Sequence, residues 1–207
     1  MPLQNRVTPT GEIVATPARG LMMGNRGCLH RPDRTLGTAR WRSKLWICCV
    51  LDFKSVRRDP MPPGRWTALF FLDEATAFAA GHRPCAYCRR AAYDTFSETW
   101  RLAHGLAARP RATELDAVLH QQRIEPLRRR QRTYPATFGT LPDGAMIRLD
   151  GQPALARGDT ALPWSPDGYG RPVVVPRSSL VEVLTPAGTV AVLARGYQPM
   201  LHPSAHG

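Results

Sequence analysis

Lysine is nearly absent from this chain of 207 residues. It occurs only at positions 44 and 54, so 26 of the 28 basic residues are arginine. Acidic residues are also few, at 16, which leaves a net charge of +12 and an isoelectric point of about 10.5. A genome rich in G and C favours arginine over lysine, but it does not explain the shortage of acids. We therefore expect an anionic partner, because the planar fork of arginine suits phosphate oxygens and guanine edges.

Long apolar runs are missing too. No stretch approaches the roughly 20 apolar residues of a membrane span, and the first 14 residues lack the apolar core of a signal peptide. We therefore expect a cytoplasmic protein with no membrane partner. Thiols stay reduced in that compartment, so the five cysteines are expected to be metal ligands or small core residues rather than disulfides.

The apolar pattern changes along the chain from strands to helices and back to strands. The clearest predicted strands are 45–53 and 66–72, and the predicted helices are 73–81, 88–105 and 113–124. Asp73 and Thr113 stand at the N-cap positions of two of these helices. From residue 134 on, turn signals such as Pro-Asp-Gly recur between short apolar pieces, which predicts a β-rich module. The fold class is therefore α+β.

Cys85 and Cys88 form a Cys-x-x-Cys pair at the predicted start of the helix 88–105. Two thiolates at this spacing point the same way across a tight turn, and the backbone N–H groups at a helix start favour their anionic form. This geometry suits one half of a tetrahedral zinc site. A redox pair is the alternative. Thioredoxin-like pairs, however, follow a strand in a βαβ setting, whereas a helix is predicted before this pair.

A zinc site needs two further ligands, and the sequence offers four candidates upstream. They are Cys28, His30, Cys48 and Cys49. Cys48 and Cys49 are adjacent in a predicted strand, so their side chains point to opposite faces and only one of them can readily face a metal. The other is expected to be a small buried core residue.

The stretch 75–90, ATAFAAGHRPCAYCRR, resembles the second half of the Ada-type zinc-binding domain of DNA repair proteins. In that family a short alanine-rich helix leads into Gly-aromatic-Arg-Pro-Cys-x-x-Cys. The first half of the family motif is Cys-Arg-Pro-x-Cys, and residues 30–34, His-Arg-Pro-Asp-Arg, fit its frame. The resemblance covers about residues 20–92. It implies a zinc-held α+β module that docks on a nucleic-acid backbone.

Two departures from the family motif change what the resemblance implies. His30 replaces the cysteine that accepts a methyl group from damaged DNA in the family, so methyl transfer is not expected here. Arg34 replaces the second cysteine and cannot bind zinc, so the fourth ligand has to come from elsewhere. The predicted zinc ligands are Cys85, Cys88, His30 and Cys49, with Cys28 as the alternative fourth ligand.

We expect three segments along the chain: an Ada-like zinc-binding module over 1–105, a basic helical connector over 106–133 and a β-rich module over 134–207. Basic residues gather in the loop before residue 45 and in the run Arg-Arg-Arg-Gln-Arg at the end of the connector. The predicted nucleic-acid-binding residues are Arg26, Arg31, Arg40, Arg42, Lys44, Arg83, Arg89, Arg128, Arg129 and Arg130.

Two functions fit these features. The first is a zinc-containing protein that binds nucleic acid, DNA in preference to RNA, in repair or in the recognition of altered DNA. The alternative is a nucleic-acid-processing enzyme, of the nuclease or base-excision type, with its pocket between the two modules. No hydrolase signature decides between them, because Asp73 and Glu74 read as a helix cap before they read as a catalytic pair.

Overall fold

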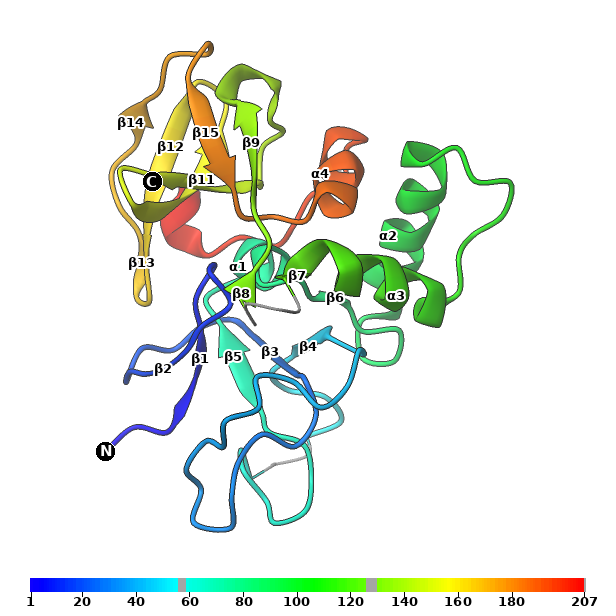
Figure 1. Ribbon diagram of the computed structural model, residues 1–207, viewed down its shortest axis with the longest axis vertical. Coiled ribbons are helices and arrows are strands. Elements are labelled where there is room, and N and C mark those ends of the chain that lie inside the picture. The colour runs from blue at the N-terminus through cyan, green and yellow to red at the C-terminus, as the bar shows by residue number, and fades with distance from the viewer. Residues whose placement is uncertain (56–58, 126–129, 207) are drawn as a thin grey trace.

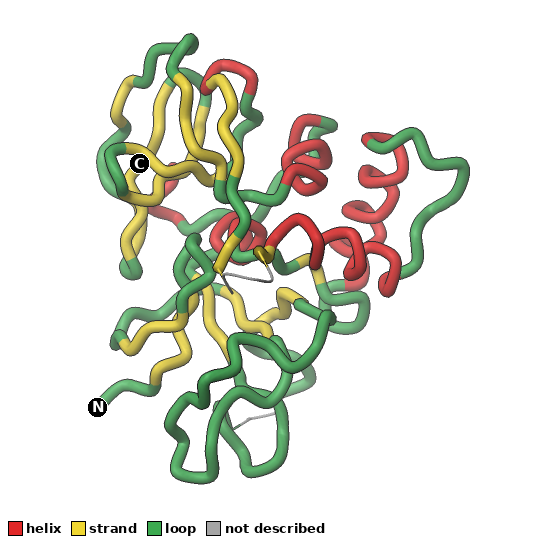
Figure 2. Tube along the Cα trace, viewed as in Figure 1, coloured by secondary structure: helices red, strands yellow, loops and turns green. Residues whose placement is uncertain are grey.

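The computed structural model describes residues 1–55, 59–125 and 130–206, and it confirms the α+β class (Figure 1). Its N-terminal part is built on a six-stranded sheet in the order β2-β1-β5-β3-β4-β6. The strands are β1 (Gln4–Val7), β2 (Ile13–Ala15), β3 (Met22–Asn25), β4 (Ile47–Val50), β5 (Leu69–Phe71) and β6 (Arg83–Pro84). The pairs β1–β5 and β4–β6 are parallel, and the other neighbours are antiparallel. Long loops extend from this sheet and form the lower part of the molecule (Figure 2).

The C-terminal part is an antiparallel sheet, in the order β13-β12-β11-β10-β15-β9, with β14 paired to β12. Its strands are β9 (Tyr134–Thr137), β10 (Met146–Leu149), β11 (Gln152–Arg157), β12 (Thr160–Ser165), β13 (Gly168–Tyr169), β14 (Val173–Val174) and β15 (Leu180–Val183). The Asp150-Gly151 turn between β10 and β11 has positive φ at both residues, as an Asp-Gly hairpin requires. This confirms the β-rich C-terminal part.

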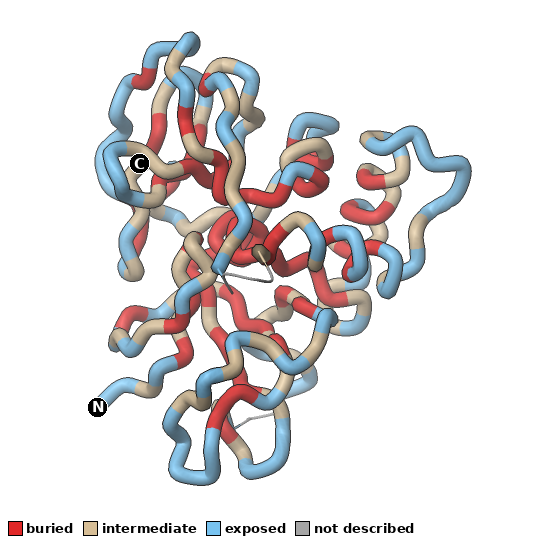
Figure 3. The backbone as a smooth tube through the Cα atoms, viewed as in Figure 1, coloured by how far each residue is buried: buried red, intermediate tan, exposed pale blue. Residues whose placement is uncertain are grey.

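The described residues also form four α-helices and a small ladder between the two sheets. The helices are α1 (Glu74–Ala79), α2 (Arg90–Ala103), α3 (Ala112–Arg123) and α4 (Ala187–Ala194), the ladder is β7 (Ile124–Glu125) with β8 (Arg130–Gln131), and two short 3-10 helices are η1 (Phe138–Thr140) and η2 (Pro203–His206). Every residue of α1 is buried, and this helix lies between the sheets in the most buried stretch of the chain (Figure 3). The helices α2 and α3 pack against α4. None of the helices described is long and apolar enough to cross a membrane.

One hydrophobic core runs through all three predicted segments. It joins Phe78 of α1, Trp100 of α2, Leu119 of α3 and Val192 of α4 to Ile147 on the C-terminal sheet. The predicted boundaries at 105 and 133 therefore fall between elements that bury their apolar faces against one another.

Asp73 caps α1 as its position in the sequence predicts. One carboxylate oxygen accepts a hydrogen bond from the backbone N–H of Thr76 at 2.9 Å. The other accepts from the hydroxyl of Tyr169 at 2.8 Å and from the backbone N–H of His202 at 3.1 Å. The cap thus also fastens the C-terminal part to the N-terminal sheet.

Glu74, the first residue of α1, has the same double role. Its Oε1 is paired with Arg89 at 2.5 Å and accepts from the hydroxyl of Tyr197 at 3.0 Å. Its Oε2 accepts from the backbone N–H of Met200 at 2.9 Å. The acidic pair is therefore a joint between the two halves of the fold.

Two predicted boundaries differ from the structure. The strand predicted over 45–53 is shorter, because after Val50 the chain leaves the sheet and turns with positive φ at Lys54 and Ser55. The N-cap of α3 is Arg111 rather than Thr113. The carboxylate of Glu114 accepts a hydrogen bond from the backbone N–H of Arg111 at 2.7 Å, so the helix is capped two residues earlier than predicted.

Candidate metal centre

The strand β4 places two adjacent cysteines on opposite faces of the sheet. Cys48 is fully buried in a core cluster with Met22 and Phe71, and its sulfur accepts from Nη1 of Arg89 at 3.7 Å. Burial raises the pKa of this thiol well above its ordinary value. Cys49 points the other way and is partly exposed. Of the two adjacent cysteines, only Cys49 therefore points toward the other candidate ligands, as the alternation along a strand predicts.

The strand β6 brings a second cysteine beside Cys49. It pairs in parallel with β4, and the backbone N–H of Cys85 donates to the carbonyl of Cys48 at 2.9 Å. The chain then turns back through Cys88 before α2 begins. As a result, the sulfur atoms of Cys49, Cys85 and Cys88 all lie within 4.8 Å of one another.

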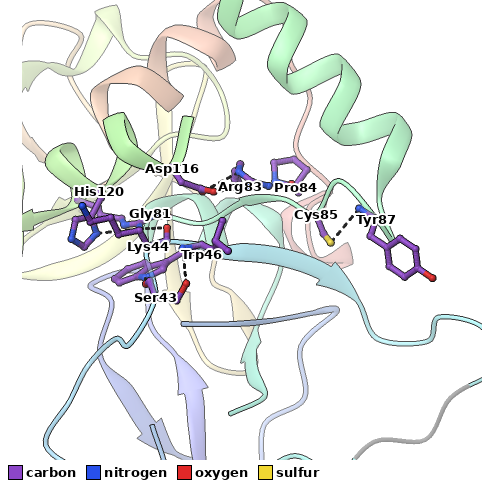
Figure 4. A network of polar contacts seen from close by, with 12 residues as sticks. Ser43, Lys44, Trp46, Gly81, Arg83, Pro84, Cys85, Tyr87, Asp116 and His120 are labelled. Atoms are coloured by element: carbon purple, nitrogen blue, oxygen red, sulfur yellow. Dashed lines mark hydrogen bonds and ion pairs between the residues drawn. The ribbon is translucent and has the colours of Figure 1, made fainter. Parts of the chain in front are cut away.

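Hydrogen bonds within this turn favour the thiolate form of two of the three sulfurs. A bond from the thiol of Cys49, together with bonds from the backbone N–H groups of Cys88 and Tyr87, outweighs burial and lowers the pKa of Cys85 to about 5. The Tyr87 N–H lies 3.4 Å from this sulfur (Figure 4). The pKa of Cys88 is lowered by a bond from Cys49 and by the N–H of Val50. The pKa of Cys49 is raised, because its proton bridges to both neighbours.

The donor set fits a soft or borderline metal ion. Three cysteine sulfurs suit zinc, which binds thiolates at about 2.3 Å and in tetrahedral geometry places them about 3.8 Å apart. A cluster within 4.8 Å reaches that spacing with small side-chain adjustments. Among the residues that the structure describes, no fourth cysteine, histidine or carboxylate belongs to the group. Zinc held here would keep one coordination position for a ligand from outside the trio.

A pocket of about 240 Å³ opens directly onto the three sulfurs. Its lining combines the cysteines with aromatic and apolar side chains from β3, β4 and the loop that follows β4. Phe53 and Trp66 come from that loop, and Tyr87 comes from the turn between Cys85 and Cys88. Phe53 and Tyr87 meet edge to face at 5.0 Å, and the ammonium of Lys54 donates to the Tyr87 hydroxyl at 3.1 Å. The pocket is therefore suited to a flat, largely uncharged group.

His30, predicted as the third ligand, lies outside the cluster. Its Nδ1 bonds the hydroxyl of Thr67 at 2.7 Å and its Nε2 the carbonyl of Pro62 at 3.1 Å, so both ring nitrogens are occupied. The same hydroxyl accepts from the backbone N–H groups of Leu29 and His30 and holds this loop in place. Cys28, the alternative ligand, is exposed and also outside the cluster. The structure therefore brings together three of the predicted ligands and neither of the upstream candidates for the fourth.

Two of the predicted nucleic-acid-binding arginines are buried in ion pairs. Arg83 contacts the carboxylate of Asp116 with two bonds, at 3.0 and 2.7 Å, and both side chains are only 3% exposed (Figure 4). Arg89 is paired with Glu74. Since burial and a carboxylate already satisfy both guanidinium groups, neither is accessible to a phosphate in this structure.

The other predicted basic residues divide by exposure. Arg26 is 2% exposed and lies in a second pocket. Arg128 and Arg129 lie outside the described residues. The exposed ones are Arg31, Arg40, Arg42, Lys44 and Arg130. Of these, Arg130 is paired with Glu125 at 2.9 Å. The loop at 40–44 carries three of the exposed charges around the half-buried Trp41, an arrangement of basic and aromatic residues that suits contacts with both phosphates and bases.

The sequence reasoning missed the aromatic residues that surround the thiols. Phe53 and Trp66 lie on loops far from the Cys-x-x-Cys pair in the sequence, and only the fold brings them together. Tyr87 stands inside the pair, so its position was a usable signal. Arg123 was not among the predicted site residues either. It is the last residue of α3 and stacks on Trp46, with its guanidinium carbon 3.9 Å from the ring centroid.

The chain matches no protein-family model, no curated protein and no solved structure at a significant level, so the site has to be interpreted from its own residues.

Proposed function

We propose that the protein is a zinc-containing nucleic-acid-binding protein, with DNA as its first partner and a role in repair or in recognition of altered DNA. The observation that carries the metal part is the convergence of Cys49, Cys85 and Cys88 within 4.8 Å beside an aromatic pocket. The resemblance of residues 75–90 to the Ada-type zinc-binding domain supports the same assignment.

The charge of the molecule supports the nucleic-acid part. A net charge of +12 creates a positive field that attracts polyanions. Arg40, Arg42 and Lys44 project this charge from one exposed loop, and Trp41 between them offers a ring on which a base can stack. Arg31 precedes them in the same stretch of loops and is also exposed. These four cations are the first candidates for phosphate contacts.

A second candidate function is the nucleic-acid-processing enzyme. The observation that favours it is the pocket at the thiols, which is lined by residues of the N-terminal part alone and not by both predicted modules. Zinc sites with three protein ligands and an open fourth position are typical of catalysis, where the metal activates a water or polarises a substrate. Three thiolates exceed the charge of one zinc ion, so such a centre is anionic and repels phosphate. Its aromatic walls suit an uncharged nucleobase instead. A base-directed activity therefore fits this site better than a nuclease.

The experiment combines metal analysis with binding and cleavage assays. The protein, purified without added metal, is assayed for zinc and then titrated with duplex, single-stranded and base-damaged DNA and with RNA, with and without divalent metal. We expect about one zinc per chain and binding that weakens with salt. Release of a base or strand cleavage that Cys85→Ser abolishes and Cys48→Ala preserves would establish the enzyme. Absence of zinc from well-folded protein, or no binding to any nucleic acid at low salt, would contradict the proposal.

A further inference from the structure

Two arginines are buried at the junction of the sheets, and neither forms an ion pair with a carboxylate among the residues that the structure describes. Arg26 follows β3 directly, and Arg123 is the last residue of α3. They are 2% and 1% exposed. In the part of the chain that the structure describes, Arg83, which is as deeply buried, is paired with Asp116, and the partly buried Arg89 is paired with Glu74. Arg26 and Arg123 take part in no ion pair among the described residues.

Arg26 is held by neutral groups. Its Nη1 donates to the carbonyl of Gly11 at 2.9 Å and its Nη2 to the carbonyl of Ala80 at 3.4 Å. Its Nε donates to Nε2 of His82 at 3.4 Å, which requires a neutral imidazole. The guanidinium carbon lies 4.1 Å from the ring centroid of Trp46. These contacts fix the position of the side chain but leave its charge uncompensated.

Arg123 is held in the same way. Its Nη1 donates to the carbonyl of Gly81 at 2.7 Å and its Nη2 to the carbonyl of Lys44 at 2.8 Å, and its buried Nε has no hydrogen-bond partner within the described structure. Its side chain packs so closely on Gly81 that a Cβ there would come within 2.4 Å of it. Gly81 also has a φ of +85°, so both its backbone and its lack of a side chain serve this contact. Arg123 is therefore positioned by the fold around it.

Burial of two like charges near each other is unfavourable. Burial lowers the pKa of both guanidinium groups to about 9. At Arg123 the charge of Arg26 lowers the pKa further, and the carboxylate of Asp116, which is already bonded to Arg83, raises it in part. At neutral pH both stay protonated, so the fold holds two desolvated positive charges whose natural complement is an anion.

A pocket of about 230 Å³ is lined by both arginines. Arg26, Trp46 and Arg123 form part of its wall, and Arg40, Trp41 and Arg130 also line it. The lining includes one carboxylate, Glu12, which is exposed. Basic residues therefore outnumber acidic ones in the pocket by four to one. Aromatic rings beside the charges provide surface for a group attached to the anion.

We propose that this second pocket binds the phosphate group of a nucleotide, with Arg26 and Arg123 as the buried cations that receive it and Arg40 at the rim. Guanidinium groups bind phosphate oxygens through paired, charge-assisted hydrogen bonds, and their stacking on Trp46 keeps their planes oriented. Trp41 provides a face for the sugar or base. The pocket shares no lining residue with the one at the thiols, so the inference does not depend on the metal centre.

The test compares phosphate with chloride at equal ionic strength. Thermal unfolding of the wild-type protein is followed against increasing inorganic phosphate, and calorimetry is then run with a nucleoside 5′-monophosphate and with an oligonucleotide that lacks terminal phosphates. We expect saturable stabilisation by phosphate that chloride does not reproduce. Tighter binding of the monophosphate assigns the pocket to free or terminal phosphates, whereas tighter binding of the oligonucleotide assigns it to the phosphates within a strand.

Two variants separate this pocket from general charge effects. Arg123→Met removes one buried cation and keeps a side chain of similar volume. It should lower the affinity for phosphate at least about tenfold, which is the loss expected for one charge-assisted hydrogen bond. Arg40→Met at the exposed rim should weaken it as well, and this variant decides the question if Arg123→Met does not fold. Arg177→Met removes an exposed charge on the opposite part of the molecule and is the matched control. Equal stabilisation by phosphate and chloride, or Arg40→Met binding like the wild type and the control, would overturn the assignment.

Discussion

Cys48 and Cys49 are neighbours in β4, yet one thiol is sealed in the core beside Arg89 and the other faces Cys85 and Cys88. The alternation of side chains along a strand produces this division. It gives the chain an internal control, because two cysteines in nearly the same place in the backbone differ in whether they can reach a metal.

Cysteine substitutions should separate ligands from core residues. We expect about one zinc per chain in the wild type and in Cys48→Ala, and loss of zinc in Cys49→Ser, Cys85→Ser and Cys88→Ser. The free energy of unfolding should fall by about 1–2 kcal/mol in Cys48→Ala, the cost of a small cavity. It should fall further in the ligand variants, because binding of a structural metal contributes directly to folding. Elemental analysis and denaturant titration measure the two effects, and mild, equal losses at all four positions would leave no role for a metal.

The buried Arg83–Asp116 pair predicts an asymmetric response to mutation. Asp116→Asn leaves Arg83 charged and uncompensated, and should cost about 3–5 kcal/mol of unfolding free energy. Replacing both partners, by Arg83→Met with Asp116→Leu, should restore most of that loss. The matched control is Asp159→Asn, which breaks the exposed Arg177–Asp159 pair and should change stability by less than about 1 kcal/mol. Urea unfolding measures all three. If the double variant is no more stable than Asp116→Asn, the loss of stability in Asp116→Asn does not come from leaving Arg83 unpaired.

His82 predicts a dependence of stability on pH. Burial, and then the charges of Arg26, Arg123 and Arg83, hold its pKa well below 6.5. The folded imidazole therefore stays neutral while the unfolded one gains a proton below its ordinary pKa. Stability from this group is fully present above about pH 6.5 and falls at lower pH, by up to about 1.4 kcal/mol per pH unit.

The variant His82→Phe removes that titration and keeps an aromatic ring against Trp46 and Phe71. Between pH 6.5 and 5 its unfolding free energy should decline less steeply than that of the wild type, by chemical denaturation at each pH. His206→Gln, at an exposed position in η2, is the control and should follow the wild type. A slope unchanged by His82→Phe would assign the pH dependence to other groups.

Nucleic-acid binding through the loop at 40–44 predicts a change in salt dependence. Each phosphate contact on duplex DNA contributes about −0.9 to the slope of log affinity against log salt. The triple variant of Arg40, Arg42 and Lys44 to Gln should therefore flatten the slope by up to about 2.7 as it weakens binding. A control with the same loss of charge replaces the exposed Arg171, Arg177 and Arg195 by Gln. Equal flattening in both triples would show that only the total charge matters, and not this loop.

The three clustered cysteines were partly predictable because their signals are local. Cys-x-x-Cys spacing and the alternation at Cys48 and Cys49 depend on a few neighbouring residues, and the cap at Asp73 is equally local. His30 lies outside the cluster because its Nδ1 is hydrogen-bonded to Thr67, which is 37 residues away in the sequence.

The arginines of the second pocket could not be predicted, because their positions also depend on long-range contacts. The charge of the chain predicted an anionic partner, but not which arginines are exposed. Arg83 is buried in an ion pair with Asp116. Arg123 was not among the predicted nucleic-acid-binding residues, yet its guanidinium group packs on Trp46, as that of Arg26 does. Contacts between residues 20 to 79 positions apart in sequence decide this, and no periodicity or spacing in the sequence indicates them.

The joint made by Asp73 and Glu74 bears on whether either half of this protein can fold alone. Each carboxylate lies in the N-terminal half but takes two of its hydrogen-bond donors from the last 40 residues of the chain. These donors are Tyr169 and His202 for Asp73, and Tyr197 and Met200 for Glu74. A gene fragment ending near residue 133 would encode two buried acids stripped of those donors and an apolar core cut open. We therefore expect that neither half folds stably without the other.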